Sequence, residues 1–297
     1  MDNTRSQFTT KDGFNMEYRL IGQGDPVLVL HGGHSNCDET FGYSELTARH
    51  FSVITPSRPG YGKTSKELGA TMASACEAYI GLLDHLQISQ AHVIGISAGG
   101  PSGIHLASRY PHRVKSLVLQ SAVSQRWLLP DDNLYKSAKM MFRPSTEAYL
   151  WASIRLINAL FPAFLFNSML ASFSKLPKEK VLPQISEEDR KQFKSMLNRQ
   201  RSKHGFLLDL DQTGHDLTAE LLAVQCPALI LHSIHDASVP VEHARYAHRH
   251  IPNAQLCELD SWGHLIWLGS GNDIMYQKLF AFLDRPGERS FPHDHRT

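Results

Sequence analysis

Residues 91–100 constrain the fold of this chain more than any other stretch. They read Ala-His-Val-Ile-Gly-Ile-Ser-Ala-Gly-Gly, and the apolar, β-branched run at their start predicts a short buried strand that a helix follows. Gly95 and Gly99 lack a Cβ, so the strand and the helix are able to approach closely. Ser97, between these glycines, is therefore expected at the tip of a sharp strand-to-helix turn, in a strained backbone conformation. A glycine-rich turn with a capping serine is the alternative interpretation.

The rest of the chain alternates between apolar runs and helical patterns. Strands that alternate with helices require a parallel sheet with right-handed crossovers. In such a sheet a functional site lies beyond the carboxyl ends of the strands. The predicted fold class is therefore α/β, with a mostly parallel eight-stranded sheet flanked by helices. Strands are expected at residues 7–10, 15–21, 27–30, 51–56, 91–96, 114–120, 227–232 and 254–259, and helices at 41–50, 72–86, 101–109, 241–249 and 274–283.

The alternation stops at Ser124 and resumes at Cys226. Residues between these points read as helices and loops, including a long apolar part at residues 149–173. Arg155 and Asn158 interrupt that part, and a charge at the centre of a bilayer costs at least ~2.5 kcal/mol. We therefore expect no stable membrane insertion. The preferred interpretation is a helical lid at residues 125–220, inserted into a core made of residues 1–124 and 221–297.

Composition narrows the class of protein. The chain has 297 residues, 42% of them hydrophobic, and a formal net charge of +1, so one large core with an insertion is expected and a nucleic-acid partner is not. The 17 histidines are scattered without metal-ligand spacing, so neither a metal nor a cofactor is expected. The 4 cysteines form no Cys-x-x-Cys pair and the N-terminus is polar, which favours reduced thiols, no signal peptide and a cytoplasmic location. A monomer or homodimer that acts on a small molecule is expected, with a frayed tail at residues 285–297.

Several motifs of this chain, and their order, resemble those of the α/β-hydrolase superfamily. The resemblance covers nearly all of the chain outside the lid, and it implies that superfamily's eight-stranded sheet with a helical cap. It also implies a serine hydrolase in which Ser97 is the nucleophile, Asp236 the acid and His264 the base. The motifs are His31-Gly32-Gly33, Arg58-Pro59-Gly60-Tyr61-Gly62, Gly95-Ile96-Ser97-Ala98-Gly99-Gly100, His235-Asp236-x-x-Val239-Pro240 and Gly263-His264.

The resemblance also implies an oxyanion hole. One main-chain N–H comes from the residue after the nucleophile and the other from the glycine loop behind an earlier strand. Ala98 and Gly33 are the residues in these places, and the N–H of His34 is the fallback for Gly33. Glycine lets the backbone come close to a substrate carbonyl oxygen. Trp127 and Trp262 are the expected substrate-binding side chains.

The chemistry requires these residue types. A serine hydroxyl is a weak nucleophile at neutral pH and needs a neighbouring base. Histidine takes up and returns a proton near pH 7, and an aspartate fixes its tautomer and stabilises its cation. Asp260, close to His264 in the sequence, is the rival acid.

Departures from related families narrow the reaction. Serine at the nucleophile position disfavours the reactions of haloalkane dehalogenases and epoxide hydrolases, which use aspartate there. We expect cleavage of a carboxylic ester or lactone with a hydrophobic acyl or aromatic group. Hydrolysis of a carbon–carbon bond in ring-cleavage products and a ligand receptor without turnover are alternatives. A proline-iminopeptidase-like aminopeptidase is a further alternative, although this chain has His34-Ser35 where that family usually has Pro-Gly. Such an enzyme needs carboxylates that face the substrate ammonium, and lid acids such as Asp209 and Asp211 are the candidates.

Overall fold

The computed structural model describes residues 4–284, so the expected fraying of residues 285–297 lies outside the described residues. Within the described part, one 8-stranded sheet has the order β1-β2-β4-β3-β5-β6-β7-β8. The two pairings that involve β2 are antiparallel, and all the others are parallel. This confirms the predicted mostly parallel sheet. The strands are β1 (Ser6–Thr9), β2 (Asn15–Ile21), β3 (Asp25–Leu30), β4 (Phe51–Pro56), β5 (Ala91–Ile96), β6 (Val114–Gln120), β7 (Ala228–Ser233) and β8 (Ala254–Leu259).

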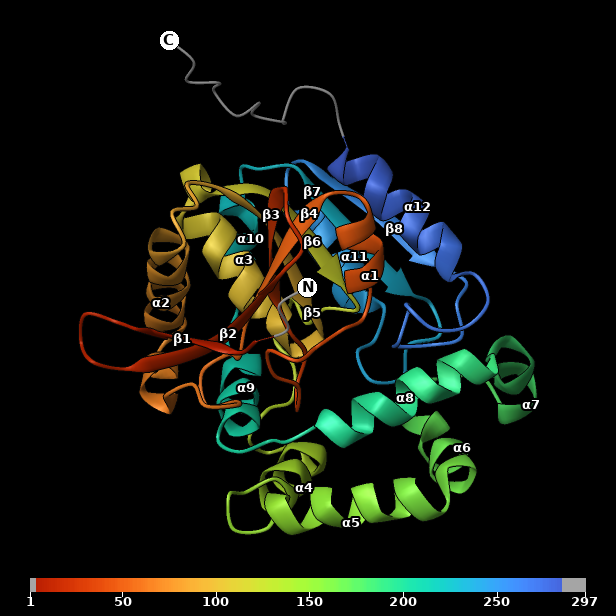
Figure 1. The fold of residues 1–297 in the computed structure, drawn as a ribbon. Coiled ribbons are helices and arrows are strands. Elements are labelled where there is room, and N and C mark those ends of the chain that lie inside the picture. Colours follow the sequence, from red (N-terminus) through yellow and green to blue (C-terminus); the bar gives the residue numbers. More distant parts are fainter. Residues whose placement is uncertain (1–3, 285–297) are drawn as a thin grey trace.

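Helices cover both faces of the sheet, and a further group lies beyond the carboxyl ends of its strands (Figure 1). The core helices are α1 (Tyr43–Ala48), α2 (Met72–His85), α3 (Gly100–Arg109), α10 (Thr218–Ala223), α11 (Glu242–His250) and α12 (Asn272–Leu283). The inserted helices are α4 (Asn133–Met141), α5 (Glu147–Leu160), α6 (Pro162–Phe173), α7 (Lys178–Val181), α8 (Glu187–Arg199) and α9 (Gly205–Thr213). Short 3-10 helices are η1 (Lys66–Gly69), η2 (Ser97–Gly99), η3 (Pro111–Arg113) and η4 (Leu182–Gln184).

The central strands are apolar on both faces because each face meets a helical layer. In β3, Leu28 and Leu30 belong to the core layer that includes α2, α3 and α11. Val27 and Val29 point the other way, into the layer with α1 and α12. All four side chains are at most 1% exposed, and burying each contributes about 1.5–3 kcal/mol.

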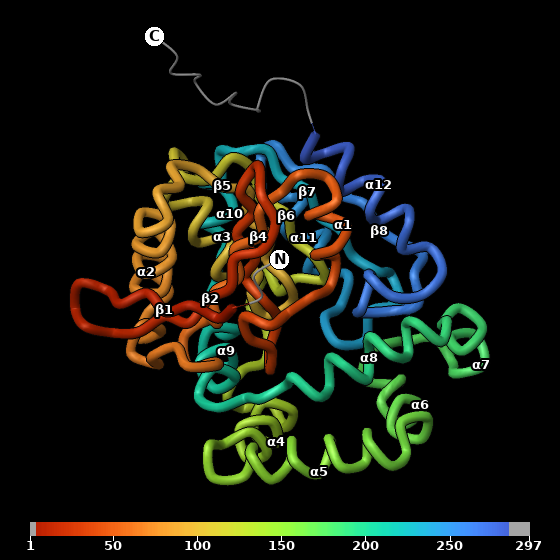
Figure 2. Tube along the Cα trace, in the orientation of Figure 1, coloured from red at the N-terminus to blue at the C-terminus, as the bar shows by residue number. Residues whose placement is uncertain are grey.

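The cap consists of α4 to α9, and α4 to α8 form a separate layer at the bottom of the view (Figure 2). The apolar stretch that resembled a membrane span is broken into α5 and α6, because Pro162 begins a new helix after Phe161. Among the described residues, no helix combines the length and the apolar character needed to cross a membrane.

For the C-terminal boundary of the cap we propose a position earlier in the chain than residue 220. A boundary at residue 220 falls inside α10, whose Leu221 is fully buried in the same core cluster as α3 and α11. Leu217, just before α10, and Val224, just after it, belong to that cluster as well. We therefore place α10 with the core and end the insertion before Leu217.

Candidate active site

The sharp turn at Ser97 brings the backbone that follows β5 into close contact with the end of β3. β5 ends at Ile96, η2 begins at Ser97, and α3 begins at Gly100. Ser97 has a φ of 49°, a left-handed conformation that costs free energy in any residue other than glycine. A Cβ on Gly99 would lie 2.1 Å from the carbonyl oxygen of Leu30, so the turn requires glycine at that position.

The structure brings Ser97, His264 and Asp236 together from three separate loops at the carboxyl edge of the sheet. His264 Nε2 lies 3.2 Å from Ser97 Oγ, and His264 Nδ1 lies 2.7 Å from Asp236 Oδ2. These distances suit transfer of the serine proton to the imidazole while a carboxylate orients the ring. The arrangement is therefore chemically competent for attack by the serine oxygen on an acyl carbon.

Asp236 is fully buried, and both of its oxygens accept hydrogen bonds. Oδ1 accepts the main-chain N–H groups of Ser238 and Val239, each at 2.8 Å. Burial by itself raises the pKa of this carboxyl, but His264 and His232 beside it outweigh burial and hold the pKa well below its ordinary value. The group therefore stays ionised opposite the imidazole.

His232 is a contact of Asp236 that the sequence did not reveal. It ends the apolar part of β7 with its Nε2 3.2 Å from Asp236 Oδ2 and 2.9 Å from the carbonyl oxygen of Val239. Because a carbonyl oxygen only accepts, Nε2 carries the proton. The only signal in the sequence was its position, at the end of the strand that precedes Asp236.

The rival acid is elsewhere. Asp260 follows β8 directly, but its Oδ1 lies 2.8 Å from His235 Nε2 and its side chain is 85% exposed. Within residues 4–284, His264 is hydrogen-bonded to Asp236 and makes no hydrogen bond or ion pair with Asp260. The geometry therefore favours Asp236 as the partner of His264.

The proposed oxyanion hole lies where the turn that contains Ala98 meets the loop that contains Gly33. A Cβ on Gly33 would lie 3.9 Å from Ala98 Cβ, so the two residues are neighbours. Neither main-chain N–H has an acceptor among residues 4–284. By contrast, the N–H of His34, the fallback donor, points to Tyr61 Oη at 3.3 Å. We therefore retain Gly33 and Ala98 as the proposed donors.

A cavity of about 410 Å³ opens over Ser97 between the core and the cap. Its wall is mainly aromatic and aliphatic, with Trp127 among the lining residues. Trp262 does not line it, and this expectation needs correction. Its side chain is fully buried, with the indole N–H donating to the carbonyl oxygen of Leu268 at 2.8 Å, because the loop after β8 folds back over it. Further lining residues include Phe41, Met141, Phe142, Trp151, Ile154, Met169, Phe173, Phe206, Leu265 and Trp267.

The carboxylates in the cavity wall are both occupied. Asp209 forms a bidentate ion pair with Arg58 at 2.6 and 2.7 Å and accepts the hydroxyl of Tyr61 at 2.6 Å. Glu39 accepts from Ser35 Oγ and from main-chain N–H groups, and Arg199 lies 3.5 Å away. Among the described residues, no lysine or arginine lines the cavity. The site therefore offers no free charge to an ionic substrate.

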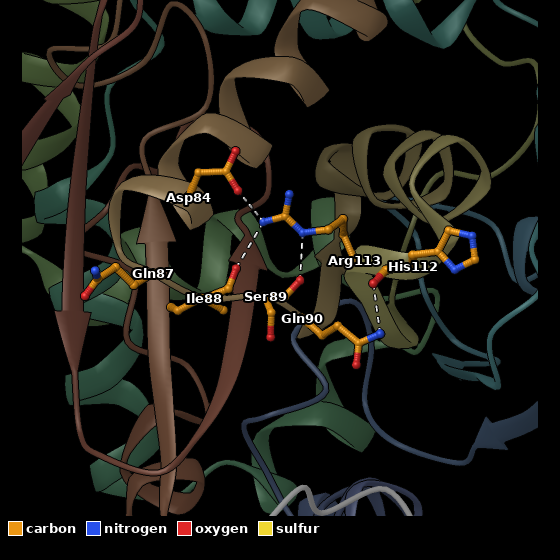
Figure 3. A pocket seen from close by; sticks show the side chains of 7 residues that line it. All are labelled: Asp84, Gln87, Ile88, Ser89, Gln90, His112 and Arg113. Atoms are coloured by element: carbon orange, nitrogen blue, oxygen red, sulfur yellow. Dashed lines mark hydrogen bonds and ion pairs between the residues drawn. The ribbon is translucent and has the colours of Figure 1, made fainter. Parts of the chain in front are cut away.

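A larger hollow of about 620 Å³ lies at the opposite edge, where β5 and β6 begin (Figure 3). Arg113 extends across it and donates to Asp84 and to the carbonyl oxygens of Ile88 and Ser89. The hollow is open to solvent, and its one cation is already paired. It lacks the convergent nucleophile and base of the Ser97 site, so its size alone does not make it a candidate.

Comparison with known proteins identifies one family. Residues 25–269 match the family described as alpha/beta hydrolase fold. The uncharacterized hydrolase YcgS of Bacillus subtilis (strain 168) is 51% identical over 94% of this chain and 99% of its own length. A 2-hydroxy-6-oxo-6-phenylhexa-2,4-dienoate hydrolase of Burkholderia cepacia is 24% identical over 89% of this chain and 91% of its own length. An alpha/beta hydrolase fold protein from Nakamurella multipartita superposes with a TM-score of 0.81 at 28% identity, covering 94% of this chain and 99% of the other.

Proposed function

Because this chain belongs to the α/β-hydrolase fold family, we propose that it hydrolyses an uncharged carboxylic ester or lactone through an acyl-enzyme on Ser97. The observation that carries the proposal is the continuous contact from Ser97 Oγ through His264 to Asp236. The apolar cavity wall supports a hydrophobic acyl or aromatic group.

In the proposed first step, His264 Nε2 takes the proton of Ser97 as Oγ forms a bond to the carbonyl carbon. The carbonyl oxygen becomes an anion that the N–H groups of Gly33 and Ala98 stabilise, a contribution worth ~10²–10³ in rate for a single donor. The bond to the leaving alkoxide then breaks, and the alkoxide takes the proton from His264. Water, deprotonated by the same imidazole, attacks the acyl carbon and releases the acid and free Ser97.

The charges in the wall favour this reaction over the aminopeptidase alternative. An aminopeptidase needs a carboxylate that faces the substrate ammonium, but Asp209 is bound to Arg58 and Tyr61. Binding an ammonium there would require breaking a buried ion pair. An ester without a charge near the reacting bond does not need that rearrangement.

Turnover of p-nitrophenyl esters tests the proposal. We expect Ser97→Ala to lower kcat by ~10³-fold or more, as for loss of other serine nucleophiles. Ser168→Ala is a matched control, because within residues 4–284 the Ser168 hydroxyl bonds only to the carbonyl of Leu165 in α6. Equal turnover by the wild type and Ser97→Ala would overturn the proposal. A single burst of product close to one per protein, without further turnover, would favour the ligand receptor.

Hydrolysis of a carbon–carbon bond is the second candidate, and the relative from Burkholderia cepacia favours it by its name. The same serine, histidine and aspartate would serve such a reaction. The cavity argues against it, because a dienoate substrate carries a carboxylate and no lysine or arginine among the described residues lines the wall. Hydrolysis of a 2-hydroxy-6-oxo-dienoate, with none of simple esters, would establish this second candidate.

A further inference from the structure

His34 lies in the cavity wall and is held by residues of both the core and the cap. Its ring stacks on Phe206 with centroids 4.0 Å apart, and its Nδ1 lies 2.8 Å from Ser202 Oγ. Its main-chain groups bind Tyr61 and Arg201. Its φ of 63° is unusual for a residue other than glycine. A side chain that is fixed and strained beside the proposed oxyanion donor Gly33 suggests a functional role.

The tautomer of His34 follows from the hydrogen bonds of Ser202. The indole N–H of Trp151 donates to Ser202 Oγ at 2.7 Å, and Ser202 is fully buried. If His34 Nδ1 also donated to Oγ, the hydroxyl proton would have no acceptor among residues 4–284. An unpaired buried hydroxyl is costly, so the hydroxyl donates to Nδ1 instead. The proton of the neutral imidazole is therefore on Nε2.

The Nε2–H of His34 is left free to face the cavity. His34 lines the cavity. Its Nε2 atom has no acceptor among the described residues, and it is not fully buried. Burial lowers the pKa of His34 to about 3, so the ring is neutral near pH 7. The cavity thus contains an uncharged donor with a fixed direction.

We propose that His34 Nε2–H determines specificity by binding a second, uncharged oxygen of the substrate. The inference rests on the proposed ester hydrolysis and deepens it: the preferred ester or lactone carries a keto, ether or hydroxyl oxygen near the scissile carbonyl. That oxygen lies near the carbonyl because His34 directly follows Gly33. A neutral oxygen suits the site, because no lysine or arginine among the described residues lines the cavity to compensate the charge of a carboxylate. An isosteric methylene in its place leaves the donor unpaired, which a site of this kind rejects.

A series of p-nitrophenyl hexanoates, with an ether oxygen in place of each chain methylene in turn, tests the proposal. We measure kcat/KM for each ether ester relative to the straight-chain ester, in the wild type and in His34→Phe. The comparison between the two proteins cancels the intrinsic reactivity of each ester. We expect one ether position to be favoured about tenfold in the wild type and by less than about twofold in His34→Phe, the range for one neutral hydrogen bond. Ratios that agree within about twofold at every position would overturn the proposal.

Phe142→Leu is the matched control. The Phe142 ring lies 4.4 Å from that of His34 and lines the same cavity, but it has no donor. We expect this variant to change cavity size while it keeps the preference for the ether ester. A loss of the preference equal to that of His34→Phe would assign the effect to packing and contradict the proposal.

Nitrogen NMR of the histidine rings separates failure of this inference from failure of the proposed function. The signal that His34→Phe removes is assigned to His34. We expect it to show a protonated Nε2 and a bare Nδ1 between pH 5 and 8, and a mixture of tautomers in Ser202→Ala. A proton on Nδ1, or titration near pH 6.5, would contradict the inference even if esters are hydrolysed. Absence of any ester hydrolysis together with the Nε2–H tautomer would refute the proposed function and, with it, the substrate class.

Discussion

The carbonyl oxygen of Phe173, the last residue of α6, accepts a hydrogen bond from the main-chain N–H of His264 at 2.8 Å. The same oxygen lies 3.3 Å from the N–H of Ala237, which follows Asp236. The end of a cap helix therefore contacts both loops that carry the base and acid of the proposed triad. Cap position and the geometry of the His264–Asp236 pair are coupled through this one carbonyl.

Gly263→Ala should disturb this contact. A Cβ on Gly263 would lie 2.3 Å from the Phe173 oxygen, so either the end of α6 or the His264 loop must move. We expect kcat on the best p-nitrophenyl ester to fall about 10²-fold, the typical effect of a displacement of about 1 Å in a catalytic group. Gly214→Ala is the control, because its Cβ would meet only Asp211 O at 3.6 Å. Unchanged kcat in Gly263→Ala would show that the contact does not position His264.

Asp209→Leu should destabilise the protein strongly. It leaves the guanidinium of the buried residue Arg58 without its carboxylate, and breaking a buried pair from one side costs about 3–5 kcal/mol of unfolding free energy. Urea unfolding measures the loss. The double variant Arg58→Met/Asp209→Leu removes the unpaired charge, so we expect it to be more stable than Asp209→Leu. A double variant less stable than this single variant would contradict the explanation.

His232→Leu should reduce activity by an effect on Asp236. The change removes the Nε2–H that lies 3.2 Å from Asp236 Oδ2. Hydrogen bonds to charged groups contribute about 1.5–3 kcal/mol, so we expect kcat to fall at least about tenfold with KM nearly unchanged. His232→Gln retains an amide donor and should recover much of the rate. If the two variants are equally impaired, packing rather than hydrogen bonding explains the effect.

His243 should make the protein less stable in acid. Its Nδ1 lies 3.2 Å from the main-chain N of Ser124 and accepts that N–H, and burial lowers its pKa from 6.5 to about 4. Between these values the unfolded chain binds more protons than the folded one, so the free energy of unfolding rises with pH across this window. His243→Asn keeps an acceptor but does not titrate. We expect its unfolding free energy to change less than that of the wild type between pH 6.5 and 4; parallel curves would contradict this.

From the sequence alone we could predict where the strands lie along the chain and where the turn that bears Ser97 occurs. These features follow from local patterns: the apolar run of β5, the glycines of the turn and the alternation of strands with helices. The position of Asp236 after β7 also followed from the chain order, and the break between the two halves of the core predicted the cap. Each of these predictions depends on residues that are neighbours in the chain.

Which distant side chains meet depends on the three-dimensional packing of the chain. Asp236 and Asp260 follow adjacent parallel strands, and the direction of each side chain decides which of them reaches His264. His34 and Ser202 are 168 residues apart, so nothing local fixes the tautomer of the imidazole. Asp209 looked available for a substrate until Arg58 was found against it. Contacts of this kind depend on how the cap packs on the core, because hydrogen-bond partners are chosen by position in space and not by distance along the chain.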